Sequence, residues 1–216
     1  MRWQWLSLVC AVSLSAEGEK SIQEWIQVLR EGDEMERYQA AEALADLAPE
    51  SVAPVTQLLS DPKPELRAAA LDALGKMGPN AKDAAPEIVK RLKDSDPGVQ
   101  IAASVALTLI GHDALPALAG AMNDDDVSVR CQVLVTLGML GRDALGAIVG
   151  ATKDKDARVR ARALDTLRES ACDASSAAMI EATLKQGGPK GREEAMKDLA
   201  QVGSGLGGLQ ERQVTG

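Results

Sequence analysis

Apolar residues recur along this chain at helical spacing, within a block that returns about every thirty residues. Four segments show the block most clearly: LRAAALDALGKMG from Leu66, VQIAASVALTLIG from Val99, VRCQVLVTLGMLG from Val129 and VRARALDTLRESA from Val159. Their starts are 33, 30 and 30 residues apart. Within each block the apolar positions fall at i, i+4, i+7 or i+8 and i+11, which is one face of a helix. The pattern therefore predicts one amphipathic helix in each copy of the block.

A second apolar block precedes each of these helices. It reads VAPVTQLL from Val52, AAPEIVKRL from Ala84, LPALAGAM from Leu115 and LGAIVGAT from Leu145. Three of these blocks carry a proline near their start, namely Pro54, Pro86 and Pro116. Proline suits the first turn of a helix, because the backbone N–H that it lacks has no partner there. Each copy is therefore predicted to be a pair of helices.

Acidic turns and glycines separate the predicted helices. The turns between the two helices of a pair lie at residues 94–97, 124–126 and 154–156. In the first of them, Asp96 followed by Pro97 is a good cap and first-turn pair for a helix start. Glycine clusters at the far end of the second helix, where we expect that helix to stop. These glycines are Gly75, Gly78, Gly111, Gly138 and Gly141.

Two weaker copies of the pattern bring the number to six. One precedes the clear copies by 30 residues, with Arg37, Ala40, Ala43, Leu44 and Leu47; the other follows them by 32 residues, with Arg192, Ala195, Leu199 and Val202. Units of this length, each burying its apolar face against its neighbours, are typical of a solenoid. The predicted fold class is therefore all-α, an α–α superhelix of about six helix pairs. The pairs span residues 19–49, 50–80, 81–112, 113–142, 143–174 and 175–202.

The recurring pattern Asp-x-Asp-x-x-Val-Arg-x-x-Ala-x-x-Ala/Thr-Leu-x-x-hydrophobic-Gly resembles HEAT repeats of the short type called PBS-lyase HEAT-like, over residues 19–202. The resemblance implies an armadillo-like helical array whose second helices line a concave face. It also implies a ladder in which an Arg and a turn Asp link successive repeats. The Arg positions are Arg37, Arg67, Arg130, Arg160 and Arg192, and the residues six earlier are Glu31, Asp61, Asp124, Asp154 and Gln186. Gln100 replaces Arg in the third repeat, so we expect the ladder to be weakest there.

Composition and charge exclude several classes of function. The 216 residues are 45% hydrophobic but only 2% aromatic, with no Phe, which argues against β-sandwiches and against proteins that stack sugars or bases. The formal net charge is −8 at pH 7. A nonspecific nucleic-acid binder would be basic, so no nucleic-acid partner is expected.

The two ends of the chain differ from the repeats. Residues 1–16 combine a positive start with an apolar run from Trp3 to Ala16, followed by charge at Glu17. This is the layout of a secretory signal, and the run is too short to span a bilayer stably. We expect cleavage after Ala16 or Ser15 and a secreted or periplasmic protein with no membrane span; an uncleaved anchor or a cytoplasmic chain is the alternative. Residues 203–216, rich in Gly, are predicted to be a flexible tail.

Groups for catalysis or metal binding are few. The single histidine, His112, lies in a predicted turn, and the chain has no His-Glu-x-x-His, Cys-x-x-Cys, P-loop or Gly-x-Ser-x-Gly motif. The His-Glu pairs of deoxyhypusine hydroxylase, an iron enzyme of this repeat family, are missing. Counted from Asp94, Val99 and Val105 stand where an EF-hand needs Gly and Glu. We therefore expect no catalytic residue, no cofactor and no metal site.

Two cysteines, Cys131 and Cys172, lie in the repeat region. Cys131 occupies the start of one second helix, whereas Cys172 lies past the end of the next. Helix geometry separates their sulfurs by roughly 15 Å, so we expect free thiols, with an intermolecular pair as the alternative.

The outward positions of the second helices differ between repeats. One position reads Glu42, Asp72, Val105, Val135, Asp165 and Lys197, and the next turn reads Asp46, Lys76, Leu109, Met139, Glu169 and Gln201. Most repeats thus present charged or polar groups there, whereas the third and fourth place Val105, Leu109, Val135 and Met139 side by side. A contiguous apolar patch rimmed by carboxylates such as Asp72 and Asp165 is typical of a groove for a peptide or helix. Burial of the patch by strong curvature, or by the tail, is the alternative.

These observations predict a non-enzymatic protein–protein interaction scaffold that binds a protein or peptide partner on its concave face. Two alternatives remain. The repeat type is similar to that of bilin lyase subunits, which favours an accessory or lyase-like subunit of an enzyme system, and a regular helical array can also be a purely structural spacer. Colour or bound metal in the purified chain would identify the first alternative.

Overall fold

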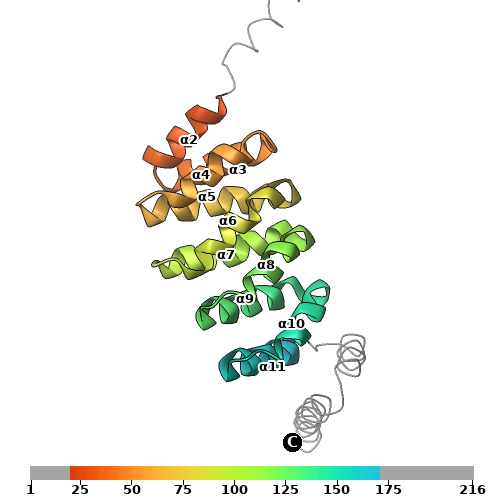
Figure 1. Ribbon diagram of the computed structural model, residues 1–216. Coiled ribbons are helices and arrows are strands. Elements are labelled where there is room, and N and C mark those ends of the chain that lie inside the picture. Colours follow the sequence, from red (N-terminus) through yellow and green to blue (C-terminus); the bar gives the residue numbers. More distant parts are fainter. Residues whose placement is uncertain (1–19, 171–216) are drawn as a thin grey trace, which may run out of the picture.

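The computed structural model describes residues 20–170, which fold almost entirely as helices (Figure 1). The α-helices are α2 (Ile22–Glu31), α3 (Glu34–Asp46), α4 (Val52–Gln57), α5 (Pro64–Lys76), α6 (Ala85–Lys90), α7 (Pro97–Ile110), α8 (Leu115–Ala121), α9 (Val127–Leu140), α10 (Leu145–Ala151) and α11 (Ala157–Ser170). Short 3-10 helices connect them: η1 (Leu58–Ser60), η2 (Gly78–Ala84), η3 (Arg91–Lys93), η4 (Gly111–Ala114) and η5 (Gly141–Ala144). No strand occurs between residues 20 and 170, in agreement with the predicted all-α class.

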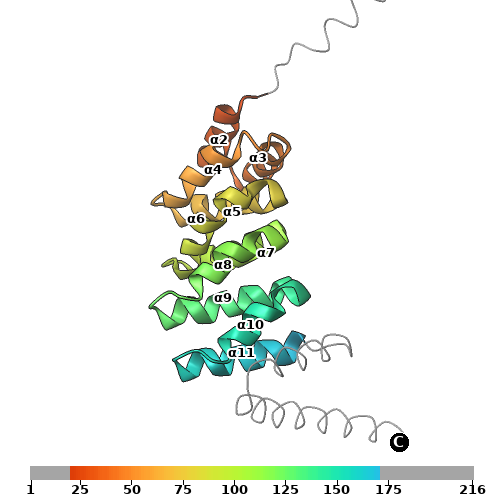
Figure 2. The ribbon, with the colours of Figure 1, turned by 45° about the vertical axis from the view of Figure 1, so that its right-hand side comes forward.

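The helices pack as pairs that stack into one elongated array. Within the pairs, α2 contacts α3, α4 contacts α5, α6 contacts α7, α8 contacts α9 and α10 contacts α11. The second helices also contact one another in chain order, from α3 to α11, as both ribbon views show (Figures 1 and 2). Five helix pairs are therefore stacked within residues 20–170. The predicted sixth pair (175–202), signal peptide (1–16) and tail (203–216) lie outside the described residues.

The first helices of the second and third pairs are less regular than the sequence pattern predicts. Helix α4 continues into η1, and α6 lies between η2 and η3. Each ends in a tight turn in which a backbone N–H donates to the carbonyl three residues earlier, Asp61 to Leu58 and Asp94 to Arg91, both at 3.0 Å. Tightening the last turn in this way gives partners to carbonyls that a helix end leaves free.

Acidic side chains begin several of the second helices. Asp33 caps α3 in a reciprocal box with Glu36, and the Asp96 carboxylate accepts from the Val99 N–H at 3.1 Å to cap α7. Asp126 caps α9 by accepting from the Ser128 N–H. Each such cap stabilises a helix by about 1 kcal/mol. The capping role predicted for Asp96 and Pro97 is confirmed, because α7 begins at Pro97.

The glycines near the ends of the second helices have two different roles. Gly78, Gly111 and Gly141 have positive φ angles of 57°, 76° and 68° and follow the helices, as a stop signal should. Gly75 and Gly138 lie inside α5 and α9, so the prediction that they stop a helix is wrong. They allow close helix packing instead: a Cβ at Gly138 would lie 2.7 Å from Cγ2 of Thr166 on α11.

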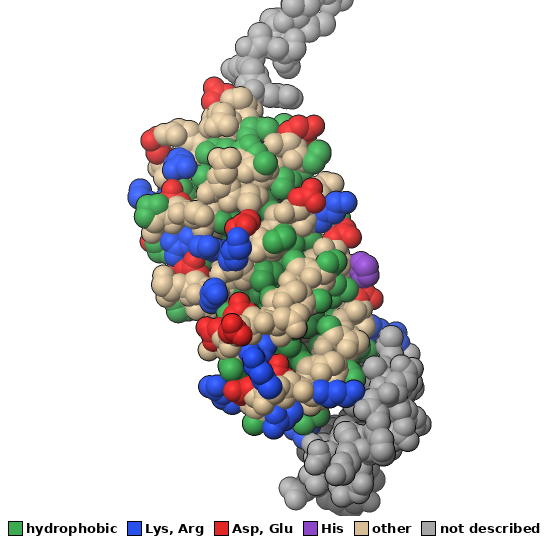
Figure 3. Space-filling view, in the orientation of Figure 1, with side chains coloured by type: hydrophobic (Ala, Val, Ile, Leu, Met, Phe, Trp, Pro, Cys, Tyr) green, Lys and Arg blue, Asp and Glu red, His purple; other side chains and the backbone are tan. Residues whose placement is uncertain are grey.

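The core is one continuous layer of aliphatic side chains between the first and second helices. Leu74 of α5, Leu107 of α7 and Leu134 of α9 are fully buried within it. Because each pair completes its core only against its neighbours, stability comes from stacking. On the side of the molecule in Figure 3, charged side chains gather mainly along the two edges of the stack, with hydrophobic side chains between them.

Two segments, Pro97–Ala121 and Val127–Ala151, are long and apolar enough by composition to cross a membrane, with a mean hydropathy of 1.5 each. In the structure each consists of two helices joined by a 3-10 turn. The buried shares of their most apolar windows are 39% and 44%. The remaining apolar residues of these segments therefore include side chains on the surface of the stack.

Candidate functional site

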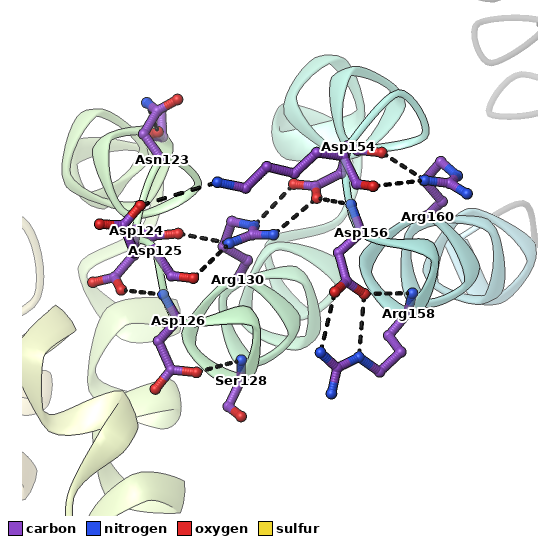
Figure 4. Close-up of polar contacts among 12 residues, drawn as sticks. Asn123, Asp124, Asp125, Asp126, Ser128, Arg130, Asp154, Asp156, Arg158 and Arg160 are labelled. Carbon is purple, nitrogen blue, oxygen red and sulfur yellow. Dashed lines mark hydrogen bonds and ion pairs between the residues drawn. The ribbon is translucent and has the colours of Figure 1, made fainter.

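Two buried ion pairs link successive repeats. Arg67 of α5 donates to both carboxylate oxygens of Asp94, which lies in the turn of the following pair; its Nε–Oδ2 distance is 2.9 Å. Arg130 of α9 binds Asp154 in the same way, with both N–O distances at 2.9 Å (Figure 4). Each Arg also donates from Nη1 to the carbonyl of the residue six positions earlier, at 2.9 and 2.7 Å. Each guanidinium therefore ties its own turn to the next turn in the stack.

This geometry corrects one expectation about the ladder. For Arg67, Arg130 and Arg160 the residue six positions earlier contributes a backbone carbonyl and not a carboxylate; Arg160, for example, donates to the Asp154 carbonyl at 2.9 Å. Arg37 donates to the carbonyl of Leu29 at 3.1 Å. The carboxylate partner comes from the following repeat, because stacking places that turn beside the guanidinium. The remaining ladder positions, Gln186 and Arg192, lie outside the described residues.

The ion pairs set the protonation of their carboxylates. The hydrogen bond from Arg130 lowers the pKa of the Asp154 carboxyl below its ordinary value, against a smaller opposing effect of burial. Burial raises the pKa of Asp94, but the hydrogen bonds from Arg67 and from the Asp96 N–H outweigh it, so the net direction is also downward. Both carboxylates are therefore ionised in the folded protein at neutral pH.

The ladder is interrupted at the third pair, as the sequence predicts. Gln100 of α7 takes the Arg position and donates to its own turn, at the Asp94 carbonyl, with a distance of 2.7 Å. Within residues 20–170, no hydrogen bond or ion pair joins Gln100 to Asp124 of the next turn. Lys93 approaches the Asp124 carboxylate instead, at 3.8 Å, and half of the Lys93 side chain is exposed. The step from α7 to α9 thus lacks the buried link that the neighbouring steps have.

A small polar cluster lies at the same step. Ser104 of α7 and Thr136 of α9 are buried, and their hydroxyl oxygens are 3.2 Å apart. Gln132 of α9 donates from Nε2 to the Ser104 hydroxyl at 3.3 Å. Neutral hydrogen bonds here take the place of a charged one, and α7 contacts α9 over less of its length than it contacts α5.

The outer side of α7 and α9 carries most of the large apolar side chains that the described residues expose. Val105, Leu109 and Met139 are 42%, 51% and 49% exposed, and Val135 is half-buried. Ile101, one turn before Val105 on α7, is 64% exposed. Ile101 is not among the residues predicted from the sequence, although its spacing of four residues from Val105 indicates the same side of the helix. We call Ile101, Val105, Leu109, Val135 and Met139 the apolar face.

Carboxylates lie on the helices to either side of the apolar face. Asp72 of α5 lies 3.6 Å from the ammonium of Lys76, and Asp165 of α11 lies 3.2 Å from the guanidinium of Arg168. About half of each carboxylate side chain is exposed. Both carboxylates therefore lie on the helices that flank α7 and α9 in the stack.

A pocket of about 280 Å³ adjoins the apolar face between α9 and α11. Val135 and Met139 line it from α9, and Arg162 and Thr166 line it from α11. Sites for drug-sized ligands are usually larger, about 300–1,000 Å³. This pocket is of a size that suits one or two side chains of a partner.

Residues with catalytic or metal-binding potential are spread out over the described part of the chain. Residues 20–170 contain no group of three or more His, Cys, Asp and Glu side chains that could hold a metal ion. His112 is exposed in η4, and Cys131 is a half-buried free thiol on α9. Cys172 lies outside the described residues.

Known proteins are similar to this chain mainly in their repeat architecture. The family model for HEAT repeats matches residues 22–87, 53–134 and 85–168, and no curated protein matches the sequence. One similar solved structure is from crescerin, which uses a TOG domain array to regulate microtubules in the primary cilium; the match covers 82% of this chain and 88% of that chain, at 16% identity and a TM-score of 0.54. The match to the CpcE–CpcF complex of phycocyanin lyase from Nostoc sp. PCC7120 covers 67% of this chain and 96% of that chain, at 22% identity and a TM-score of 0.44. The match to a designed armadillo repeat protein in complex with the peptide (KR)4 covers 84% of this chain and 99% of that chain, at 15% identity and a TM-score of 0.40.

At these identities, likeness between structures shows the fold alone. The family matches are stronger evidence, because together they span residues 22–168, well over half of the chain. They coincide with the stacked helix pairs of the structure. The chain therefore belongs to the HEAT-repeat family.

Proposed function

We propose that this chain is a non-enzymatic interaction scaffold that binds a peptide or helix of another protein across the apolar face. The observation that carries the proposal is the exposure of Ile101, Val105 and Leu109 on α7 beside Met139 on α9. The three residues of α7 are spaced by four, so they form one strip along the helix. Contiguous exposed apolar surface of this kind marks interaction sites in soluble proteins.

Comparison with the other second helices supports the choice of this face. The equivalent positions are Glu42 on α3, Asp72 on α5 and Asp165 on α11, which water solvates readily. Only the middle of the stack departs from this charged pattern among the described repeats. The resemblance to HEAT arrays implies that this is the concave face, and on such a face a partner segment would contact several helices at once.

The expected affinity is moderate. Burying the four exposed side chains of the apolar face, Ile101, Val105, Leu109 and Met139, contributes at most roughly 6–10 kcal/mol before the cost of ordering the partner. Ordering costs of about 4 kcal/mol or more leave at most about 6 kcal/mol, so we expect a dissociation constant no tighter than roughly tens of micromolar. Met139 favours tolerance of different anchors, because its unbranched thioether adapts to the shape of a partner.

A titration with matched variants tests the proposal. A peptide selected by the full chain from a random display library is titrated into the native chain, the Val105→Asp/Met139→Asp variant and the Ala119→Asp variant. Ala119 is exposed on α8, a first helix, and controls for the added charge. We expect about tenfold or greater weakening for the double variant only, with a small change in Tm because both residues are half-exposed.

Four outcomes would contradict the proposal. Equal affinity of the double variant and the native chain would place the binding surface elsewhere. Unfolding of the double variant would show that these positions are core. Failure of the native chain to select any peptide would favour the spacer alternative, whereas a coloured purified chain would favour the lyase-like alternative.

We also infer that the protein acts outside the cytoplasm, which rests only on the sequence of residues 1–16. Amino-terminal sequencing of protein from its native host should begin at Ala16 or Glu17. Recovery of chains that begin at Met1 from the cytosol would overturn this inference.

A further inference from the structure

The surface formed by the second helices changes character along the stack. Equivalent positions carry Glu42 and Asp46 on α3, then Asp72 on α5, before the apolar face begins on α7. Asp46 is exposed, and the exposed fractions of the Glu42 and Asp72 side chains are 54% and 47%. We call Glu42, Asp46 and Asp72 the acidic rim. It continues the apolar face across the contact between α5 and α7.

One cation of the chain already lies within this rim. The ammonium of Lys76 is 3.7 Å from a carboxylate oxygen of Glu42, 3.6 Å from one of Asp72 and 3.4 Å from the centre of the Tyr38 ring. It makes no hydrogen bond with either carboxylate. One ammonium offsets one of three carboxylates, so the rim keeps a net negative charge and exposed acceptor oxygens.

The opposite border of the apolar face has no such bias. On α11, Asp165 is paired with Arg168 at 3.2 Å, and Arg162 lines the adjoining pocket. Acidic and basic groups are therefore mixed there. A positively charged partner is therefore attracted more strongly by the α3–α5 side than by the α11 side.

We propose, building on the function proposed above, that the partner segment combines aliphatic side chains seated on the apolar face with Lys or Arg seated against the acidic rim. Packed helices are about 8–10 Å apart, and an extended chain advances about 3.3 Å per residue. An extended segment therefore needs about three residues to reach from one helix to the next. The basic residue is then about three to six residues away from the aliphatic anchors.

Two other occupants fit the charge less well. A second copy of this chain would carry the same net charge of −8, which opposes contact at an acidic rim. A cytoplasmic-type membrane surface is negative, and the rim would repel it. The basic, aliphatic segment is the occupant that matches both parts of the surface.

A display library of random twelve-residue peptides tests the proposal, because such a peptide spans about four helices. The library is selected against the full chain, the Glu42→Gln/Asp46→Asn/Asp72→Asn variant and the Val105→Asp/Met139→Asp variant. We expect the native chain to enrich Lys or Arg together with Leu, Ile, Val or Met at the stated spacing. The neutralised-rim variant should keep the aliphatic enrichment and lose the basic one, and the apolar-face variant should lose the aliphatic enrichment.

The affinity of one selected peptide supplies a second readout. It should fall about tenfold or more between roughly 50 mM and 500 mM NaCl with the native chain, and much less with the neutralised-rim variant, because salt screens exposed charges. Peptides rich in aliphatic residues but without basic enrichment would overturn this proposal and leave the proposed function standing. Binding of anionic vesicles that both variants abolish, or self-association through this face, would overturn it in favour of a membrane or a second copy.

Discussion

The interrupted ladder predicts that a single substitution, Gln100→Arg, stabilises the protein. Asp124 is already oriented as the paired carboxylates are: it accepts from a backbone N–H two residues later at 2.9 Å, and the carboxylates of Asp94 and Asp154 do so at 3.1 and 2.8 Å. An Arg at position 100 occupies the register from which Arg67 and Arg130 reach the next turn. The new guanidinium is therefore expected to bind a partner that is held in place.

The size of the gain follows from opposing contributions. Charge-assisted hydrogen bonds contribute about 1.5–3 kcal/mol, and fixing the Arg side chain costs up to about 2 kcal/mol, part of which Gln100 already loses. The net gain is about 1 kcal/mol, which raises the Tm of a domain of this size by about 2–4 °C. Lys at this position offers a point charge without the planar fork, so Gln100→Lys should gain less.

Thermal and urea unfolding of a double-mutant cycle tests this reasoning. The four chains are the native protein, Gln100→Arg, Asp124→Asn and the combination of both changes. The gain from Gln100→Arg should disappear in the Asp124→Asn background, which isolates the new pair. A gain of equal size in both backgrounds, or no gain at all, would refute the view that the α7–α9 step lacks only this link.

Three further predictions concern the same framework. Arg67→Met should lower the free energy of unfolding by about 2–3 kcal/mol, because it leaves the buried Asp94 carboxylate with only the more distant Arg91, at 3.6 Å, as a cationic partner; a change below about 1 kcal/mol, measured by urea unfolding, would contradict this. The folded-state pKa values of Asp94 and Asp154 are lowered, so their stabilisation is present above the unfolded value of about 3.9 and is lost as the pH falls through the folded value. Tm should therefore stay level above about pH 5 and fall as the pH drops from about 5 to about 3, and a flat profile over that range would contradict buried ionised pairs. Gly138→Ala should destabilise the fold, because the added Cβ would lie 2.7 Å from Thr166 on α11. Gly146→Ala, which has open space around it in α10, should stabilise the fold by about 0.5–1 kcal/mol. Thermal melts in which both variants change Tm in the same direction would contradict this packing.

Most of the fold could be predicted from residues that are close together in the sequence. The helical spacing of the apolar block predicts α5, α7, α9 and α11, and Asp96 with Pro97 predicts where α7 begins. These features depend on neighbouring residues in the sequence, so a sequence reading can find them. The 3-10 endings of the first helices depend on how the last carbonyls find partners, which the apolar pattern does not encode.

Features that depend on contact between repeats were harder to predict. The sequence indicates that Arg67 belongs to a ladder, but its carboxylate partner, Asp94, is set by how far one turn lies from the next. Gly138 resembles a helix stop in the sequence, and only the approach of Thr166 shows why a larger residue does not fit. The apolar positions on α7 and α9 could be predicted from the repeat register, whereas the pocket beside them requires the packing of α11.

The central claim is that the apolar face is where a partner binds, and methyl NMR tests it most directly. A peptide selected by the native chain is added to protein labelled at the methyl groups of Ile, Leu, Val, Met and Ala. The largest shift changes should come from Ile101, Val105, Leu109 and Met139, with small changes at Ala119 on α8. Largest changes on the first helices, with the apolar face unaffected, would contradict the claim.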